Sequence, residues 1–260
     1  MIYIESKDNA LFKATKKLKE KKNRNKEGKY IIEGFRLIEE AFKANMQVEY
    51  IILSEESQNK LNEYLSEYID KNSKIYVLSG NLISQLTSTE HPQGVVAVVK
   101  NREMPKEING DFYLLCDKVQ DPGNLGTIIR TAHAAGVDGI ILTKGTVDIY
   151  NDKTIRSTMG SIFYVPIIYE DENLNFLNKL RNEGFSLVST SLEESKDFFK
   201  EDLRGKVILS VGNEGNGISE EIFSLSDKKV KIPMPGGAES LNVAVATSII
   251  LFEKVRQNLQ

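Results

Sequence analysis

Cysteine and histidine are nearly absent from this chain of 260 residues. The single cysteine, Cys116, excludes a disulfide within the chain, and a lone thiol inside an apolar run is typical of a reducing compartment. The two histidines are His91 and His133, and no His/Cys cluster has the spacing of a metal site, so we expect no metal. No uncharged apolar run approaches the roughly 18–20 residues that span a bilayer, and the N-terminus has no signal-peptide pattern. These absences predict a soluble, cytoplasmic protein.

Positive charge is concentrated at the N-terminus. Residues 1–30, which we call the basic arm, contain ten Lys or Arg and four acidic residues, a net charge of +6 in a chain whose total is −3. Such an arm on an otherwise acidic protein is typical of contact with a nucleic-acid backbone. The same residues also allow a solvated amphipathic helix, with Leu11, Phe12 and Leu18 inside and lysines outside.

Segments with the periods of strands and helices alternate along the chain, which predicts an α/β protein. The first run of alternation covers residues 28–100, so with the basic arm we predict a domain over residues 1–100. Residues 101–110 are polar and contain Pro105, and we interpret them as a linker. Residues 111–260 form a second predicted domain. Its repeated βα units indicate a mostly parallel sheet, with ligand groups at the carboxyl ends of the strands.

The individual elements follow from the same periodicity. Strands are predicted at residues 29–34, 48–53, 74–78, 94–99, 112–116, 139–142, 165–169, 185–190 and 207–211. Helices are predicted at residues 35–45, 57–69, 81–86, 127–135, 152–159 and 174–182. A last helix carries no charge over residues 241–252, so we expect it to be buried on nearly all sides.

Two glycine-rich loops follow apolar runs near the C-terminus. The run 207–211 breaks into GNEGNG at residues 212–217, and the run 230–232 stops at PMPGG, residues 233–237. A pocket made by such loops is lined mostly by backbone. It suits a neutral, planar, hydrogen-bonding ligand such as adenine better than a polyphosphate. Two surface turns that flank a core helix are the alternative interpretation.

The segment DPGNLG, residues 121–126, partly resembles a dinucleotide-binding fingerprint. Only Gly123 and Gly126 of its three glycines are present, and no acidic residue follows at the position that would bind a ribose. A nucleotide-dependent oxidoreductase is therefore a poor third hypothesis. Taken singly, Asn124 is typical of a turn or cap, and Arg130 of a helix surface.

The combination of motifs is more specific. Asn124-x-Gly126-x-x-x-Arg130, the loop 212–217, Ile232-Pro233-Met234 and Ser240-Leu241-Asn242-Val243-Ala244 occur in this order. Together they resemble the three signature motifs of the SpoU (TrmH-type) RNA ribose 2′-O-methyltransferases of the SPOUT superfamily, and the resemblance covers residues 111–260. Arg156-Ser157 with Gly160, and Thr190-Ser191, resemble intermediate segments of that family. The basic arm and the stretch IIEGFRLIEEAF resemble the substrate-binding domain of its ribosomal-RNA branch.

The resemblance implies the cofactor, the topology and the reaction. The cofactor would be S-adenosylmethionine, bound in a deep trefoil knot made by threading the C-terminal helix through a loop. The reaction would be methyl transfer to a ribose 2′-hydroxyl of structured RNA, with 23S ribosomal RNA as the leading substrate, in a homodimer that completes each site across its interface. A transfer-RNA ribose methyltransferase and a catalytically silent RNA-binding protein with the same fold are the alternatives. No membrane or metal partner is implied.

The resemblance also assigns roles to residues, with the leading catalytic role on Arg130. Because arginine is a poor base, we expect Arg130 to bind a phosphate and lower the effective pKa of the ribose hydroxyl. The catalytic residues expected to orient Arg130, the hydroxyl and the loops of the knot are Asn124, Glu214, Ser240 and Asn242. The expected cofactor-binding residues are Thr190, Ser191, Gly212, Asn213, Glu214, Gly217, Ile232, Pro233, Met234, Ser240, Leu241, Asn242 and Ala244. The expected RNA-binding residues are Lys7, Lys13, Lys16, Lys17, Arg24, Arg36 and Arg156.

Overall fold

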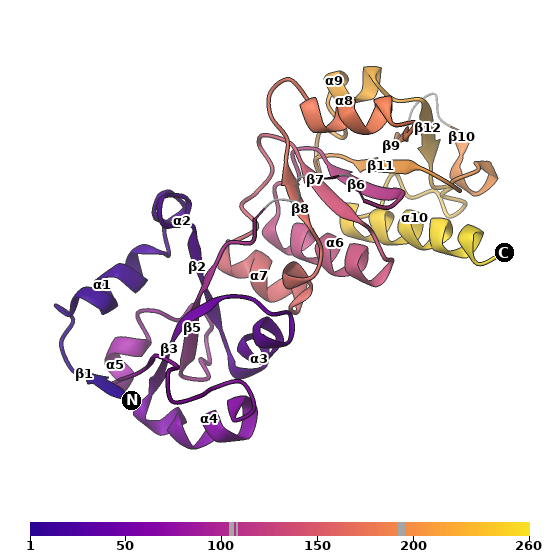
Figure 1. Cartoon of the computed structure of the whole chain (residues 1–260). Coiled ribbons are helices and arrows are strands. Elements are labelled where there is room, and N and C mark those ends of the chain that lie inside the picture. Colours follow the sequence, from indigo (N-terminus) through magenta and orange to yellow (C-terminus); the bar gives the residue numbers. More distant parts are fainter. Residues whose placement is uncertain (104–106, 108, 192–195) are drawn as a thin grey trace. The chain divides into compact units, whose positions relative to one another are not determined.

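The computed structural model describes residues 1–103, 107, 109–191 and 196–260. Contacts between residues divide the chain into two compact units (Figure 1). The N-terminal unit consists of Met1–Glu103 and Tyr150–Phe163, and the C-terminal unit of Met104–Ile149 and Tyr164–Gln260. The predicted linker lies partly outside the described residues, which do not include 104–106 and 108. No helix in the described part of the chain is long and apolar enough to cross a membrane.

A mixed sheet is the centre of the N-terminal unit. Over the described residues it has five strands in the order β1-β4-β3-β5-β2. β3 pairs in parallel with β4 and antiparallel with β5, and β5 pairs antiparallel with β2. The valines of β5 are fully buried because this strand lies inside the sheet. The strands are β1 (Ile2–Ile4), β2 (Lys29–Glu33), β3 (Val48–Ser54), β4 (Ile75–Leu78) and β5 (Val95–Lys100).

Helices pack on this sheet through two groups of side chains. Phe12 of the first helix and Leu82 of the fifth join Ile52 of β3 in one apolar cluster. In the other group, Phe35 stacks on Tyr64 with ring centroids 5.3 Å apart. The helices of this unit are α1 (Ala10–Lys17), α2 (Lys21–Glu27), α3 (Phe35–Lys43), α4 (Gln58–Leu65), α5 (Gly80–Ile83) and α7 (Asp152–Thr158), with short 3-10 turns at Glu55–Ser57 and Ser161–Phe163.

The basic arm is part of this folded unit. Phe12 and Leu18 are buried, so the amphipathic-helix interpretation is right about their side chains. Arg24 is also buried, and its Nη1 donates to the carbonyl oxygens of Leu18 and Lys19 at 2.9 and 2.7 Å. Our assignment of Arg24 to RNA binding is therefore corrected. The guanidinium holds the turn between α1 and α2, where the carbonyls at the end of a helix need donors.

The segment Tyr150–Phe163 packs with the N-terminal unit although its sequence lies between elements of the other one. Tyr150 stacks on Tyr30 with ring centroids 4.3 Å apart. Asp152 accepts a hydrogen bond from the hydroxyl of Ser88, and Arg102 Nη1 donates to the carbonyl of Phe163 at 2.8 Å. The sequence boundary at 111 does not anticipate this grouping, because these contacts join residues far apart in the chain.

A parallel sheet is the centre of the C-terminal unit. Across the described residues its seven strands run in the order β10-β12-β9-β11-β6-β7-β8, and every neighbouring pair is parallel. The expectation of a mostly parallel sheet is confirmed. The strands are β6 (Phe112–Cys116), β7 (Gly139–Leu142), β8 (Ile167–Tyr169), β9 (Ser186–Thr190), β10 (Lys196–Asp197), β11 (Val207–Val211) and β12 (Lys228–Lys231). β1 and β10 have only three and two residues, so they are too short for a period to show.

Both faces of this sheet are covered by helices (Figure 1). On one face, Leu177 of α8 and Ile222 of α9 pack with Ile208 of β11. On the other, α6 and α10 lie side by side, and the hydroxyls of Thr131 and Ser248 are 3.2 Å apart between them. Because each face is covered, β6 and β11 are buried along their whole length. The helices are α6 (Pro122–Ala134), α8 (Asn175–Asn182), α9 (Glu220–Ser224) and α10 (Val243–Asn258), with a 3-10 turn at Phe198–Lys200.

Two helix predictions need correction. α6 begins at Pro122, five residues earlier than expected, because the Asp121 carboxylate caps it by accepting from the Asn124 N–H at 2.8 Å. α10 is not buried on nearly all sides, since Val245 and Phe252 are 49% and 47% exposed. Absence of charge predicted burial, but only one face of α10 meets the sheet.

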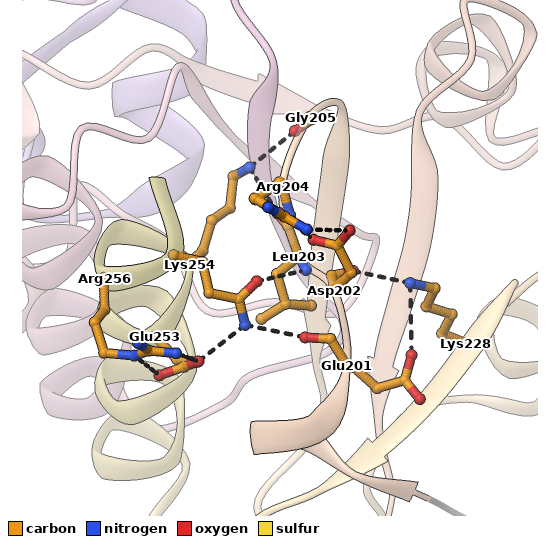
Figure 2. A network of polar contacts seen from close by, with 10 residues as sticks. Glu201, Asp202, Leu203, Arg204, Gly205, Lys228, Glu253, Lys254 and Arg256 are labelled. Atoms are coloured by element: carbon orange, nitrogen blue, oxygen red, sulfur yellow. Dashed lines mark hydrogen bonds and ion pairs between the residues drawn. The ribbon is translucent and has the colours of Figure 1, made fainter. Parts of the chain in front are cut away.

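A polar network ties the end of α10 to the loop before β11 (Figure 2). Lys254 is fully buried, and its Nζ donates to the carbonyls of Leu203 and Gly205 at 2.9 and 2.8 Å. Gln257 accepts from the Leu203 N–H at 2.8 Å and donates to the carbonyl of Glu201 at 3.0 Å. Burial lowers the pKa of Lys254, although nearby aspartates oppose this. The ammonium therefore satisfies loop carbonyls at the cost of its own desolvation.

We expect Lys254→Met to show this cost as a pH dependence. The pKa of Lys254 in the folded protein lies below its unfolded value of about 10.4. At pH values between these two pKa values, the unfolded chain binds the proton of Lys254 more tightly than the folded chain does. The free energy of unfolding of the wild type, relative to Lys254→Met, should therefore rise as the pH rises toward 10. Urea unfolding of both proteins between pH 7 and 10 measures this difference. Lys228→Met, which removes a lysine bound to the Asp202 carbonyl of the same loop, is the control. A difference that stays constant with pH would contradict the prediction.

Candidate functional site

A cavity of about 460 Å³ lies in the C-terminal unit, where the carboxyl ends of β9, β11 and β12 meet the start of α10. Most of the residues expected to bind a cofactor line it: Thr190, Ser191, Gly212, Asn213, Glu214, Gly217, Ile232, Met234, Ser240, Leu241 and Asn242. Pro233 and Ala244 do not line the cavity, and Ala244 is buried in the first turn of α10. The two glycine-rich loops thus form one pocket instead of two separate surface turns.

The loop 212–217 closes on itself. The backbone N–H and C=O of Asn213 pair with those of Gly217 at 2.8 and 2.9 Å, and the Asn213 side-chain oxygen accepts from the N–H groups of Gly215 and Asn216. A Cβ at Gly212 would come within 2.1 Å of the Gly217 carbonyl carbon. Only glycine therefore allows this close turn at position 212. The Asn213 amide also donates to the carbonyl of Lys118 at 2.9 Å, which ties the loop to the chain after β6.

Glu214, Asn124 and Asn242 form a hydrogen-bonded relay between three separate parts of the chain. The Glu214 carboxylate accepts from the backbone N–H groups of Gln120 and Asp121, both at 3.1 Å, and from the Asn124 amide nitrogen at 3.0 Å. The Asn124 side-chain oxygen accepts from the Asn242 amide at 2.9 Å. The other end of Asn242 caps α10 by accepting from the N–H groups of Ala244 and Val245.

The relay keeps Glu214 ionised. Burial alone would raise the pKa of this carboxyl group, but the hydrogen bonds from Asn124, Gln120 and Asp121 outweigh it and lower the pKa. A group with a lowered folded pKa stabilises the fold above its unfolded value and loses that contribution as the pH falls through the folded pKa. Around neutral pH, Glu214 is therefore a fixed anion that positions the start of α6.

Arg130 is placed differently from the other expected catalytic residues. It lies on α6 six residues after Asn124, about 9 Å farther along the helix axis. It is exposed, does not line the cavity, and makes no hydrogen bond or ion pair with the residues that the structure describes. Within one chain, the structure brings together Asn124, Glu214 and Asn242, with Ser240 on the cavity wall, but not Arg130.

Of the remaining lining residues, Gly215 and Val243 lie in the expected loops, whereas Val230, Lys231, Ala246 and Ile250 were not anticipated from sequence. Val243, Ala246 and Ile250 share one face of α10, and their helical spacing was a usable signal. Lys231, the last residue of β12, is the only lysine or arginine among the described residues that line the cavity. No local pattern marked Lys231, because its role depends on where the sheet places the end of that strand.

All of the expected RNA-binding residues belong to the N-terminal unit. Lys7 and Lys17 are exposed, as is Arg36 on α3. Lys13 pairs with Asp8 at 2.7 Å, and Lys16 donates to Gln85 at 2.7 Å, but both lysines remain on the surface. Arg156 is half-buried on α7. Apart from Arg24, these side chains are therefore positioned where a ligand can reach them.

The geometry defines a nucleoside-binding α/β protein. The cavity lies at the carboxyl ends of parallel strands, has a volume typical of small-molecule sites, and is lined by backbone with one acidic and one basic side chain. Over the described residues, no group of three or more His, Cys, Asp or Glu side chains is arranged to hold a metal ion. The site therefore favours a polar, uncharged ring system held by main-chain groups.

The family model of the SpoU rRNA Methylase family matches residues 111–252, and that of the MRM3-like substrate binding domain matches residues 9–97. The chain therefore belongs to the SpoU rRNA methylase family. It is 38% identical to the 23S rRNA (guanosine(2553)-2′-O)-methyltransferase RlmP of Bacillus subtilis, over 97% of this chain and 98% of that protein. It is 33% identical to a 23S rRNA (uridine(2479)-2′-O)-methyltransferase of Streptomyces viridochromogenes, over 91% of this chain and 87% of that protein.

A solved structure with the same fold contains the cofactor. The SpoU methyltransferase AviRb of Streptomyces viridochromogenes, in complex with AdoMet, superposes with a TM-score of 0.87 and 31% identity, over 97% of this chain and 99% of that one. The expected SPOUT architecture is thereby confirmed, whereas the trefoil knot stays a prediction. The residues present here fit S-adenosylmethionine, because the loops offer main-chain groups to adenine and Lys231 offers a positive charge to a methionine carboxylate.

We expect Asn242→Ser to separate the relay from the helix cap. Serine still caps α10, so the free energy of unfolding should stay within about 0.5 kcal/mol of the wild type. It cannot reach Asn124 as the Asn242 amide does, so the dissociation constant for S-adenosylhomocysteine should rise about tenfold, or about 1.4 kcal/mol. Calorimetric titration and urea unfolding measure the two effects. Asn242→Ala should lose both functions and be less stable by about 1 kcal/mol. Unchanged affinity in the serine variant would show that the relay does not shape the pocket.

We expect Lys231→Met to reveal the carboxylate partner of the cofactor. Binding of S-adenosylhomocysteine should weaken about tenfold, since a charge-assisted hydrogen bond is lost. Binding of 5′-methylthioadenosine, which lacks the amino-acid carboxylate, should not change. The matched control is Lys229→Met, because the Lys229 ammonium lies 3.8 Å from the centre of the Phe223 ring instead of at the cavity. Equal weakening of both ligands would mean that Lys231 acts through the shape of the pocket.

Proposed function

We propose that this protein transfers a methyl group from S-adenosylmethionine to a ribose 2′-hydroxyl of large-subunit ribosomal RNA. The observation that carries the proposal is the Glu214–Asn124–Asn242 relay, which joins all three motif segments at the wall of one nucleoside-sized cavity. A protein that only binds RNA would need neither this cavity nor this relay. Its single buried thiol, Cys116, supports a cytoplasmic location.

Ribosomal RNA is favoured over transfer RNA by the N-terminal unit. Residues 9–97 match a substrate-binding domain, and the two relatives named for 23S rRNA are similar over nearly the whole of this chain. These relatives act on different nucleotides, guanosine 2553 and uridine 2479. The proposed substrate class is therefore large-subunit ribosomal RNA.

The chain's own residues have to align the ribose and help its hydroxyl to lose a proton. The bound cofactor supplies a methyl group on a sulfonium, which needs an in-line approach. The relay fixes the loop 212–217 and the start of α10 relative to the start of α6. The walls of the cavity are therefore in place before the substrate binds. Arg130 binds a phosphate next to the target ribose and stabilises the developing alkoxide, since a guanidinium is a poor base.

A homodimer would bring Arg130 to a cavity. Arg130 is exposed and lies outside the cavity of its own chain, so a second copy has to present it. The exposed apolar side chains of α10, Val245 and Phe252, are suitable for a contact between two copies. In this arrangement Arg130 of one chain faces the cavity of the other.

Methyl transfer from tritiated S-adenosylmethionine to an unmethylated 23S rRNA transcript tests the function. We expect incorporation into ribose of this RNA and much less into bulk transfer RNA. Arg130→Ala should lower kcat by about 10²–10³-fold with unchanged affinity for S-adenosylhomocysteine, because only transition-state charge stabilisation is lost. The kcat of Arg130→Lys, which keeps the charge without the planar guanidinium, should lie between those of the wild type and Arg130→Ala. Near-normal turnover of Arg130→Ala would remove Arg130 from the chemistry.

Mixing two inactive variants tests the site across the dimer. Arg130→Ala and Asn242→Ala subunits, refolded together, should recover activity, since one of the mixed sites combines an intact cavity with an intact arginine. A site built within one chain would stay inactive in the mixture. Light scattering that shows only monomer at micromolar concentration would also count against the dimer.

A further inference from the structure

A second cavity, of about 420 Å³, lies wholly within the N-terminal unit. Its walls come from the start of α3, from the chain between α5 and β5, and from the end of α7. Arg36, Arg156 and Met159 line it together with Gln93 and the carboxylates of Glu33 and Glu40. The cavity is nearly as large as that for the cofactor, and the roles proposed above for the chain do not use it as a pocket.

Two arginines, Arg36 and Arg156, line this cavity. Nη1 of Arg156 is buried and has no hydrogen-bond partner among the described residues. A buried donor without an acceptor is rare in folded proteins, and Arg156 holds it in the wall between this cavity and a smaller pocket beside Ser88 and Asp152. Arg36 is exposed and forms no ion pair or hydrogen bond with the part of the chain that the structure describes. Gln93 uses its side-chain oxygen to accept from the Phe35 N–H at 3.1 Å, so its amide nitrogen remains a donor.

An apolar side chain is held at the rim of the cavity. Met159 is 69% exposed, and its backbone has a positive φ of 50°, which is uncommon for a residue other than glycine. Gly160 follows with a φ of 90°, and a Cβ there would come within 2.6 Å of the Glu40 side chain. The turn is therefore packed tightly against α3, and it presents a flexible, polarisable thioether of the kind that packs against flat rings.

The charges of the lining argue against a bare phosphate as the ligand. Glu33 and Glu40 place carboxylates beside Arg36 and Arg156, and Glu40 also pairs with Lys43 at 3.9 Å, so the lining has no excess of positive charge. Glu33 is already engaged, since it accepts from the Ser88 N–H at 2.7 Å and from the Thr89 hydroxyl. A cavity with arginine donors, a carboxylate acceptor and an apolar rim matches a nucleobase. Guanine fits best, because arginine pairs with its O6 and N7 and a carboxylate accepts from its N–H groups.

We propose that this cavity binds one unpaired guanosine of the RNA substrate, separate from the nucleotide that is methylated. The inference rests on the proposed function for its RNA substrate. Single-stranded RNA is recognised by drawing bases out of the stack and reading their edges, and the lysines of the basic arm in the same unit supply the backbone contacts. The basic arm then gives affinity, and this guanosine cavity gives the register of the RNA.

Fluorescence anisotropy with labelled RNA pentamers tests the proposal on the full chain. UUGUU should bind about tenfold more tightly than UUAUU, UUCUU or UUUUU, and the basic arm should contribute equally to all four because it contacts phosphates. Arg36→Gln and Met159→Ser, both at exposed positions, should each remove most of this preference. Lys71→Gln, an exposed lysine of the same unit that does not line the cavity, is the matched control and should keep it.

Three outcomes would overturn the inference. They are equal binding of the four pentamers, a preference for guanosine that survives both variants, and affinity for free GMP as high as that for UUGUU. Titration with S-adenosylhomocysteine should give wild-type affinity in every variant, which shows that the C-terminal unit is intact. Methyl transfer to 23S rRNA without any guanosine preference would reject this site and leave the proposed function standing. A guanosine preference without methyl transfer would reject the proposed function and leave the guanosine cavity standing as an RNA-binding site.

Discussion

The hydrogen-bonded relay from Glu214 through Asn124 to Asn242 is the interaction on which the C-terminal unit depends. Its members come from the first turn of α6, the loop 212–217 and the N-cap of α10, and each side chain uses both of its polar ends. Each donor in this network has its own acceptor, so a shift of one member breaks a hydrogen bond of another. The cavity is therefore shaped by the protein itself before any ligand arrives.

The parallel sheet explains why those loops meet. Strands that run in one direction place all their carboxyl ends at one edge, and β9, β11 and β12 bring their following loops to the same place. Helices on both faces bury the strands but do not cover this edge, where the cofactor cavity lies. The network around Lys254 serves the opposite end of α10, where it fastens that helix to the loop before β11 (Figure 2). α10 is thus held at its start by the relay through Asn242 and at its end by the hydrogen bonds of Lys254.

The cofactor cavity and the guanosine cavity differ in the chemistry of their linings, which suits two kinds of ligand. The cavity of the C-terminal unit is lined mainly by main-chain groups, which recognise an invariant cofactor. The guanosine cavity of the N-terminal unit is lined by arginines, carboxylates and a methionine, which distinguish one base from another. Arg130 lines neither cavity within one chain, which is the observation behind the proposed homodimer.

Local sequence by itself determined the elements and the loops of the site. Apolar runs marked β6, β7 and β11 to the residue, and glycines and prolines marked the loops that line the cofactor cavity, because backbone conformation depends on neighbouring residues. Family motifs added Asn124, Glu214 and Asn242, which the structure brings together. Only the tertiary structure decided that Arg24 is buried, that Tyr150–Phe163 packs with the N-terminal unit, that Lys231 reaches the cavity, and that Val245 and Phe252 stay exposed. The physical reason is that burial and partner choice depend on residues distant in the chain, and no local period records which face of an element another element will cover.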